Sequence, residues 1–287
     1  MKMLSFGEIL WDVYPSSKAI GGASLNLAAH AALLGNDAYL VTAVGDDELG
    51  SEAIDVVTKL KINDKFISTL SDKETGAVIV TLNEKGIPSY EIKDNVAYDF
   101  IKQPEISRYS FDVLAFGSLS LRHNENKETL AAILASNSFS EIYTDLNIRL
   151  PHSTKKSVNF CLSNATIVKV SDEELPIVSN WIFSKEYSPE EFAIEIAKKY
   201  PKIKLIIITM GEKGSFAFDT AKAEFYYCDA IATKVVSTVG AGDSFGAAFL
   251  TKYFQGIDIN TCLNFASKLS SYVCSKKEAV PDLNEFV

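Results

Sequence analysis

Three small residues and an acid open an apolar helix near the end of the chain. Gly240, Ala241 and Gly242 let a ligand approach the backbone closely, and the start of the helix directs free N–H groups at it. Asp243 follows in the first turn, where the positive end of the helix dipole keeps a carboxylate ionised. Phosphoryl transfer needs this combination, because donors hold the charge of the moving group and a carboxylate accepts the proton of the attacking hydroxyl.

The same segment has two other interpretations. It can be a glycine-rich turn in which Asp243 only caps the helix, and taken alone that interpretation is as good as the catalytic one. It also resembles a loosened dinucleotide-binding fingerprint, with Asp258 about 20 residues beyond the first glycine. The fingerprint fails on context, because the residues after Gly246 keep helical spacing to about Gln255 where a strand is required.

A glycine pair stands before a second helix, near the start of the chain. Gly21 and Gly22 can pack backbone against a polyhydroxy ligand whose hydroxyls the amide of Asn26 can bind. Asp12 lies beside an aromatic residue and can hold a sugar in a similar way. Without another signal, the plainer interpretation is favoured, namely a tight turn, a polar residue at a helix start and a solvated acid.

A third polar group follows a predicted strand at residues 141–146. Asp145, Asn147 and Arg149 project there at the carboxyl edge of a sheet, where α/β proteins bind ligands. Arg149 offers a fixed fork of donors to a hydroxyl, a carboxylate or a phosphate. By spacing alone, an arginine paired on the surface is the commoner case.

Two long segments are similar to the signatures of the PfkB, or ribokinase-like, carbohydrate kinases. They are GGASLNLAAHAALLG at 21–35 and STVGAGDSFGAAFL at 237–250, over 200 residues apart as in that family. The segments AVGDDELG, TMGEKGS and LNFASKLSSYVCSKKEAVP also fall where the family has similar sequences, so the resemblance covers essentially the whole chain. It implies an ATP-dependent kinase that phosphorylates a primary hydroxyl of a sugar-like substrate. The chain has no GxxxxGK[ST] motif, which is consistent because the family holds ATP without a Walker loop.

The resemblance also implies roles for individual residues. Asp243 matches the catalytic base of the family. The positions that match its anion hole are Gly240, Ala241 and Gly242. The positions that match its sugar contacts are Asp12, Gly22 and Asn26.

On the nucleotide side, a loop after a strand matches the family's loop along ATP, with Thr209, Gly211 and Gly214. Asn264 falls where the family often places a residue near the adenine. Glu174 resembles the Glu of the NxxE motif, which acts on Mg²⁺ through water, although Ser171 replaces the Asn. Ser237 replaces an Asp that often helps to form a monovalent-cation site, so a dependence on potassium is left open.

The choice of sugar rests on two shorter resemblances. The DxNxR segment is similar to that of bacterial fructokinases and of 2-keto-3-deoxygluconate kinases, and it implies that Asn147 and Arg149 bind substrate. Phe116 to Leu119, with Arg122 downstream, is more like the fructokinases. We therefore expect a fructokinase, with 2-keto-3-deoxygluconate or another sugar or a nucleoside as the alternative substrate. A catalytically silent sensor on the same fold is a further alternative, against which the intact GAGD argues.

Alternating strand-like and helix-like segments must position these residues. Apolar runs at 3–9, 39–44, 113–119, 141–146, 166–170 and 203–209 predict strands, and the clearest helices are 24–34, 48–60, 127–135, 190–199 and 241–254. This alternation predicts an α/β fold with a doubly wound, mainly parallel sheet flanked by helices.

Two hairpins interrupt the alternation. One joins residues 76–82 and 87–92 through NEKG, and the other joins 215–220 and 223–228. We expect a single domain over residues 1–287, with a small β-sheet lid from roughly 11–20 and 76–95. Val78, Val80 and Leu82 alternate along the first hairpin, which predicts an exposed apolar face and a homodimer through the lid.

Composition excludes several other classes of protein. The chain has 287 residues, of which 47% are hydrophobic and 23% charged, and this is ordinary for a globular enzyme. A net charge of −9 opposes binding to nucleic acid. The four cysteines form no CxxC pair, and no apolar stretch approaches the roughly 18 residues of a membrane span. We expect a cytoplasmic protein with small-molecule partners and neither nucleic acid nor membrane among them.

Overall fold

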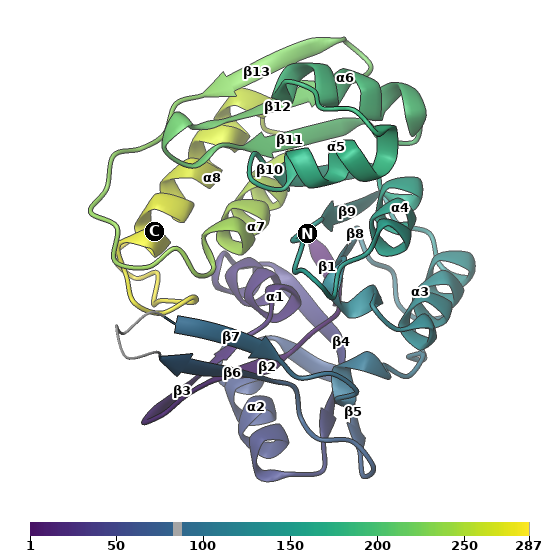
Figure 1. Cartoon of the computed structure of the whole chain (residues 1–287), viewed down its shortest axis with the longest axis vertical. Helices are drawn as coiled ribbons and strands as arrows, with labels where there is room; N and C mark the ends of the chain where they lie inside the picture. Colours follow the sequence, from purple (N-terminus) through teal and green to yellow (C-terminus); the bar gives the residue numbers. More distant parts are fainter. Residues whose placement is uncertain (83–87, 287) are drawn as a thin grey trace.

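The computed structural model describes residues 1–82 and 88–286, and within these ranges the strands form two sheets (Figure 1). The larger sheet has nine strands, in the order β13 (Glu224–Cys228), β12 (Ser215–Asp219), β11 (Leu205–Thr209), β10 (Ile167–Ser171), β9 (Glu141–Asp145), β8 (Val113–Gly117), β1 (Lys2–Phe6), β4 (Asp37–Gly45) and β5 (Asn63–Leu70). The strands from β11 to β5 pair in parallel, and β12 and β13 add an antiparallel hairpin at one edge. The predicted mainly parallel sheet is confirmed.

Helices cover both faces of this sheet, so the fold is doubly wound (Figure 1). One face carries α1 (Ala23–Leu33), α2 (Glu48–Lys59), α7 (Ala241–Tyr253) and α8 (Ile259–Cys274). The other face carries α3 (Asn124–Ser136), α4 (Lys155–Asn164), α5 (Leu175–Phe183) and α6 (Pro189–Lys199).

The strand β11 is buried on both faces, which explains its unbroken apolar sequence. Ile206 and Ile208 belong to the core beneath α3 to α6, whereas Leu205 and Ile207 belong to the core beneath α1, α7 and α8. A strand that is buried on both faces needs a continuous apolar run rather than an alternating one.

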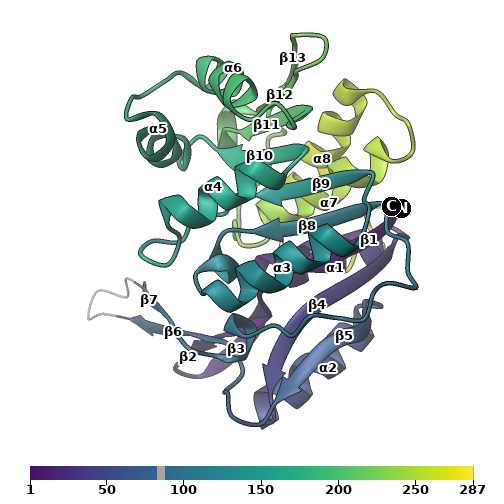
Figure 2. The ribbon, with the colours of Figure 1, turned by 90° about the vertical axis from the view of Figure 1, so that its right-hand side faces the viewer.

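A second sheet of four strands lies beside the carboxyl end of the large sheet (Figure 2). Its order is β3 (Ser17–Gly21), β2 (Leu10–Tyr14), β6 (Ala77–Leu82) and β7 (Pro88–Ile92). The strand β2 follows β1 after a short connection, which brings this sheet to the edge where α/β proteins bind ligands.

Both predicted hairpins are antiparallel strand pairs, β6 with β7 and β12 with β13. The NEKG turn of the first hairpin lies outside the described residues. The prediction that the first hairpin exposes an apolar face was wrong for Val78 and Val80. These residues are 6% and 1% exposed within the single chain. Val78 packs with Leu10 of β2 and with Tyr98, so this chain itself covers that part of the face, whereas Tyr14 and Tyr90 on the same face stay exposed. The side chain of Leu82 lies outside the described part. Within residues 1–82 and 88–286, no helix combines the length and the apolar character that a membrane span requires.

Candidate active site

The two signature segments meet in the structure. Asn26 on α1 donates a hydrogen bond from Nδ2 to Oδ2 of Asp243 on α7, at 2.8 Å. The helices α1 and α7 pack against each other beneath the sheet, which brings together residues 217 positions apart (Figure 1). The side chain of Asn26 is 4% exposed, and its Oδ1 atom has no partner among the described residues.

The start of α7 leaves backbone donors free for an anion. Gly240 has φ 80°, and a Cβ at this position would lie 2.4 Å from the carbonyl oxygen of Ala279, so only glycine fits. The amide of Ala241 donates to the carbonyl of Thr238 at 3.2 Å. Within the described ranges, the amides of Gly240, Gly242 and Asp243 have no hydrogen-bond partner. The free donors at this helix end therefore include Asp243 but not Ala241.

The environment of Asp243 suits a base that works near neutral pH. Contrary to the expectation from the helix dipole, the carboxyl is not held ionised: burial raises its pKa to about 7, and the charge of Asp145 acts in the same direction. The hydrogen bond from Asn26 and the ammonium of Lys169 oppose that rise. A carboxyl with this pKa can accept a proton and release it again at physiological pH.

A buried ion pair lies directly beside Asp243. Lys169 of β10 and Asp145 of β9 are register partners on neighbouring strands, and their Nζ and Oδ2 atoms are 2.6 Å apart. The sequence did not identify Lys169 as a site residue. A lysine inside the apolar strand TIVKV was the signal, because a charged residue in a doubly covered strand needs a partner.

Glu174 links two loops at the carboxyl edge. Its Oε2 accepts a hydrogen bond from the amide of Ser171 at 2.9 Å, and its Oε1 accepts one from the amide of Ile148. Each carboxylate oxygen thus has one backbone donor and keeps acceptor capacity for water. The residues fit the predicted contact to Mg²⁺ through water, and they also show that Glu174 holds the DxNxR loop against the end of β10.

Among the residues predicted to bind the sugar, Gly22 has φ 111° at the start of α1. A Cβ there would lie 2.4 Å from the carbonyl oxygen of Glu8, so the close approach requires glycine. Asp12 lies on β2 beside the adjacent Gly21, and burial raises its pKa. The predicted sugar residues Asp12, Gly22 and Asn26 therefore come from β2 and from the start of α1.

A second acid in this region was not predicted. Glu8 is 3% exposed; its Oε1 accepts a hydrogen bond from the amide of Ala23 at 3.2 Å, and its Oε2 has no partner among the described residues. Burial raises its pKa, and the charges of Arg149 and Arg122 oppose the rise. An acid within the apolar run predicted as a strand at 3–9 was the available signal.

The DxNxR segment leaves its arginine available. Asn147 has φ 40°, a left-handed conformation that turns the chain after β9. The side chain of Arg149 is exposed, and within the described part of the chain it donates one hydrogen bond, to the carbonyl of Ile148 at 3.3 Å. Its guanidinium therefore keeps donors for a ligand.

Arg122 has a different role from Arg149. Its side chain is 5% exposed and forms two hydrogen bonds, of 2.6 and 2.7 Å, to the fully buried carboxylate of Asp99. It also donates to the carbonyl of Lys93, just after β7, at 2.7 Å. Arg122 thus joins the base of the small sheet to the main sheet.

The predicted nucleotide residues lie at the same edge, on the side of β11 and α8. Thr209 ends β11, and in the loop after it Gly214 has φ 92°, with its would-be Cβ 2.2 Å from the carbonyl oxygen of Cys228. Gly211 has φ 54° with open space around it. Asn264 is exposed on α8, and Cys228 at the end of β13 lies beside it.

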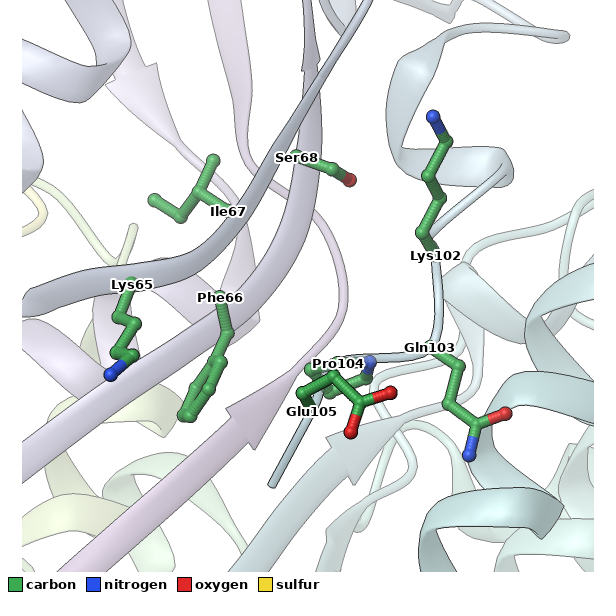
Figure 3. Close-up of a pocket in the computed structure, with 8 residues that line it drawn as sticks. All are labelled: Lys65, Phe66, Ile67, Ser68, Lys102, Gln103, Pro104 and Glu105. Atoms are coloured by element: carbon green, nitrogen blue, oxygen red, sulfur yellow. The ribbon is translucent and has the colours of Figure 1, made fainter. Parts of the chain in front are cut away.

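A cavity of about 210 Å³ lies elsewhere, between β5 and residues 102–105 (Figure 3). A second cavity, of about 250 Å³, lies between the start of α2 and the base of the small sheet. None of the predicted site residues lines either cavity. The candidate active site is therefore the cluster around Asp243.

His30 predicts an acid sensitivity of the folded chain. It is fully buried on α1, and its Nε2 lies 2.9 Å from the carbonyl oxygen of Ala279, the residue that packs on Gly240. Burial lowers its pKa to about 4 from 6.5. Between these values the unfolded chain binds a proton that the folded chain excludes, so stability falls as pH falls, by about 3 kcal/mol over the window.

Urea unfolding at pH 7 and pH 4.5 checks this expectation. Other acids titrate over the same range, so the comparison is with His30→Gln, which stays neutral at both values. The loss of stability on acidification should be smaller in this variant by about 2 kcal/mol. Equal losses in the two proteins would contradict the assignment.

Comparison with known proteins finds relatives that match nearly the whole chain. The chain is 28% identical to "Probable fructokinase-2" of Arabidopsis thaliana, over 98% of this chain and 92% of that protein. It is also 28% identical to a 5-dehydro-2-deoxygluconokinase of Listeria innocua, over 99% of this chain and 90% of that protein. A solved fructokinase of Vibrio cholerae O395, with fructose, ADP and calcium bound, superposes with a TM-score of 0.83 at 21% identity, over 98% of this chain and 95% of that one. The family model of the pfkB carbohydrate kinases matches residues 10–285, and the chain therefore belongs to that family.

Proposed function

We propose that this carbohydrate kinase transfers the γ-phosphoryl group of ATP to a terminal hydroxyl of fructose. The observation that carries the proposal is the 2.8 Å hydrogen bond between Asn26 and Asp243, because it joins the predicted sugar site to the predicted base. The sugar hydroxyl that reaches Asp243 is then the one that reacts.

The transfer has a simple balance of bonds and protons. Asp243 accepts the proton of the sugar hydroxyl, whose oxygen forms a bond to the γ-phosphorus. The bond from this phosphorus to the bridging oxygen breaks, and ADP leaves with the electron pair. The free amides of Gly242 and Asp243 stabilise the charge of the moving group. Bound Mg²⁺ would neutralise phosphate charge, and Glu174 would hold it through water.

The charges on the sugar side favour a neutral substrate. Glu8 and Asp12 both place carboxyl groups there, and burial raises the pKa of each. Arg122 is already neutralised by Asp99. An anionic sugar acid would meet two carboxyl groups with Arg149 left to pair with it, whereas the hydroxyls of fructose can donate to both carboxyls. The fructokinase names among the relatives support the same choice, and the Listeria 5-dehydro-2-deoxygluconokinase and the 2-keto-3-deoxygluconate kinases represent the alternative.

The nucleotide is proposed to lie along the loop of Thr209, Gly211 and Gly214. Asn264 would then lie near the adenine. The segment leading to Gly240 supports this placement, because it exposes large apolar side chains that a base can cover, namely Val235, Val236 and Val239. The ADP bound in the Vibrio structure supports a nucleotide on this fold.

A coupled ADP-release assay tests the proposal directly. The panel contains fructose, 2-keto-3-deoxygluconate, 5-dehydro-2-deoxygluconate and a nucleoside, each with ATP and Mg²⁺. Fructose should give the highest kcat/KM. A higher value for either sugar acid would assign the alternative substrate, and binding without turnover throughout would identify a sensor.

We further propose that the small sheet closes as a lid over the sugar, within one domain of residues 1–287. The register places Tyr14 and Tyr90 on the same face of this sheet as Asp12, and they are 37% and 62% exposed. A second copy that covers these rings would form the expected homodimer. Sedimentation should show a dimer, and Tyr14→Ser with Tyr90→Ser should give monomer; a monomeric parent protein would overturn the dimer.

All four cysteines lie in the described part and are free thiols, which supports a reducing cytoplasm.

A further inference from the structure

A buried ammonium group lies behind the first turn of α7. The Lys169 side chain is 5% exposed, and its Nζ would be 3.1 Å from a Cβ built on Gly242. Oδ2 of Asp145 would be 3.8 Å from the same point. The absence of a side chain at position 242 therefore opens a direct path between this ion pair and the free amides at the helix start.

The ammonium has donors to spare. A lysine carries three N–H donors, and Nζ of Lys169 has one hydrogen-bond partner within residues 1–82 and 88–286, namely Asp145. A buried cation is unfavourable unless it is paired and hydrogen-bonded, and an ion pair alone satisfies one donor of the three. The remaining donors are thus free for an acceptor that the described residues do not supply.

Charge balance indicates what kind of acceptor this is. Asp145, Glu174 and Asp243 all act electrostatically on Lys169, so the region around the helix start is predominantly negative. A phosphoryl group that approaches the amides of Gly242 and Asp243 brings further negative charge. The ammonium of Lys169 is placed to offset that charge at the point where transfer occurs.

We propose that Lys169 is a further catalytic residue, whose ammonium donates to an oxygen of the phosphoryl group during its transfer from ATP to the sugar. Asp145 is its positioning residue, because it fixes Nζ beside Gly242. The inference rests on the proposed kinase reaction and adds one donor to it; the bonds formed and broken are those given above.

The test must separate this role from mere neutralisation of Asp145. Lys169→Met alone leaves a carboxylate unpaired and can unfold the chain. The informative protein is therefore the double variant Asp145→Asn with Lys169→Met, which removes both charges at similar volume. A matched control is Glu141→Gln with Lys204→Met, which removes another ion pair, of 2.8 Å. Glu141 begins β9 and Lys204 precedes β11, so this pair lies at the opposite edge of the sheet from Asp243.

Turnover gives the first readout. The double variant should retain the parent melting temperature and lose about 10²- to 10³-fold in kcat, the usual effect of removing one donor to a transition-state oxyanion. The control should keep its kcat within about twofold. A double variant with nearly the parent kcat would overturn the proposal, because Lys169 would then only neutralise Asp145.

Nucleotide affinity gives a readout without turnover. The affinity for a non-hydrolysable ATP analogue should fall about tenfold in the double variant, while the affinity for ADP stays unchanged, since only the γ-phosphoryl group reaches Lys169. Equal affinities for the analogue in the two proteins would overturn the proposed contact. Another outcome is a parent protein that phosphorylates no sugar, together with a double variant that still loses affinity for the analogue alone. That result would refute the proposed function and retain the phosphate contact.

Discussion

Asp243→Asn is expected to lower kcat by about 10³-fold and to leave the fold intact. The asparagine has nearly the same shape and can still face Asn26, but it cannot accept the proton of the attacking hydroxyl. Affinity for the ATP analogue should be unchanged, because the free amides at the helix start belong to the backbone. Single-turnover kinetics with the preferred sugar would measure the chemical step directly.

The pH profile of the parent enzyme belongs to the same prediction. The pKa of Asp243 is about 7, so below that value the carboxyl is protonated and cannot act as a base. The rate should therefore rise with pH through about 7 and then level, and this rise should be absent from the residual activity of Asp243→Asn. Glu173→Gln, at an exposed acid, should keep both kcat and the profile. An Asp243→Asn enzyme with more than about a tenth of the parent kcat would exclude the mechanism.

Arg122→Met is expected to destabilise the chain by about 3 to 5 kcal/mol, because it leaves the carboxylate of Asp99 buried without its cation. The Asp99 side chain is fully buried, and the lost contacts include the hydrogen bond to the carbonyl of Lys93 at the base of the small sheet. The KM for the sugar should therefore rise together with the loss of stability. Urea unfolding measures the first effect and the ADP-release assay the second.

A double variant and a surface pair complete that experiment. Asp99→Asn with Arg122→Met removes both buried charges and should recover most of the lost stability. Lys198→Met breaks an ion pair to Glu195 on α6, where the lysine is 66% exposed, and should change stability by less than about 1 kcal/mol. A parent-like stability of Arg122→Met alone would show that the buried pair contributes nothing to the fold.

The sequence by itself determined eight of the nine strands of the large sheet, its edge hairpin among them, and the two segments that meet at Asp243. Each of these depends on local information: a continuous apolar run for a strand buried on both faces, such as β11, and small residues with an acid at the start of α7. No apolar run predicted β2, β3 or β5 as a strand, although residues 11–20, which hold most of β2 and β3, were expected to lie in the β-sheet lid. They carry exposed polar residues, such as Lys18 and Asp64, and their apolar pattern is short and mixed.

Only the tertiary structure decided how the charged groups pair. The partner of Lys169 is Asp145 and that of Arg122 is Asp99, and the strength of each pair depends on burial, which no local pattern encodes. The same holds for the Asp243 pKa, which rises because folding removes water and brings Asp145 near. A sequence lists the charges along one dimension, whereas electrostatic energy depends on distances and on the local dielectric, and these exist only once the chain is packed.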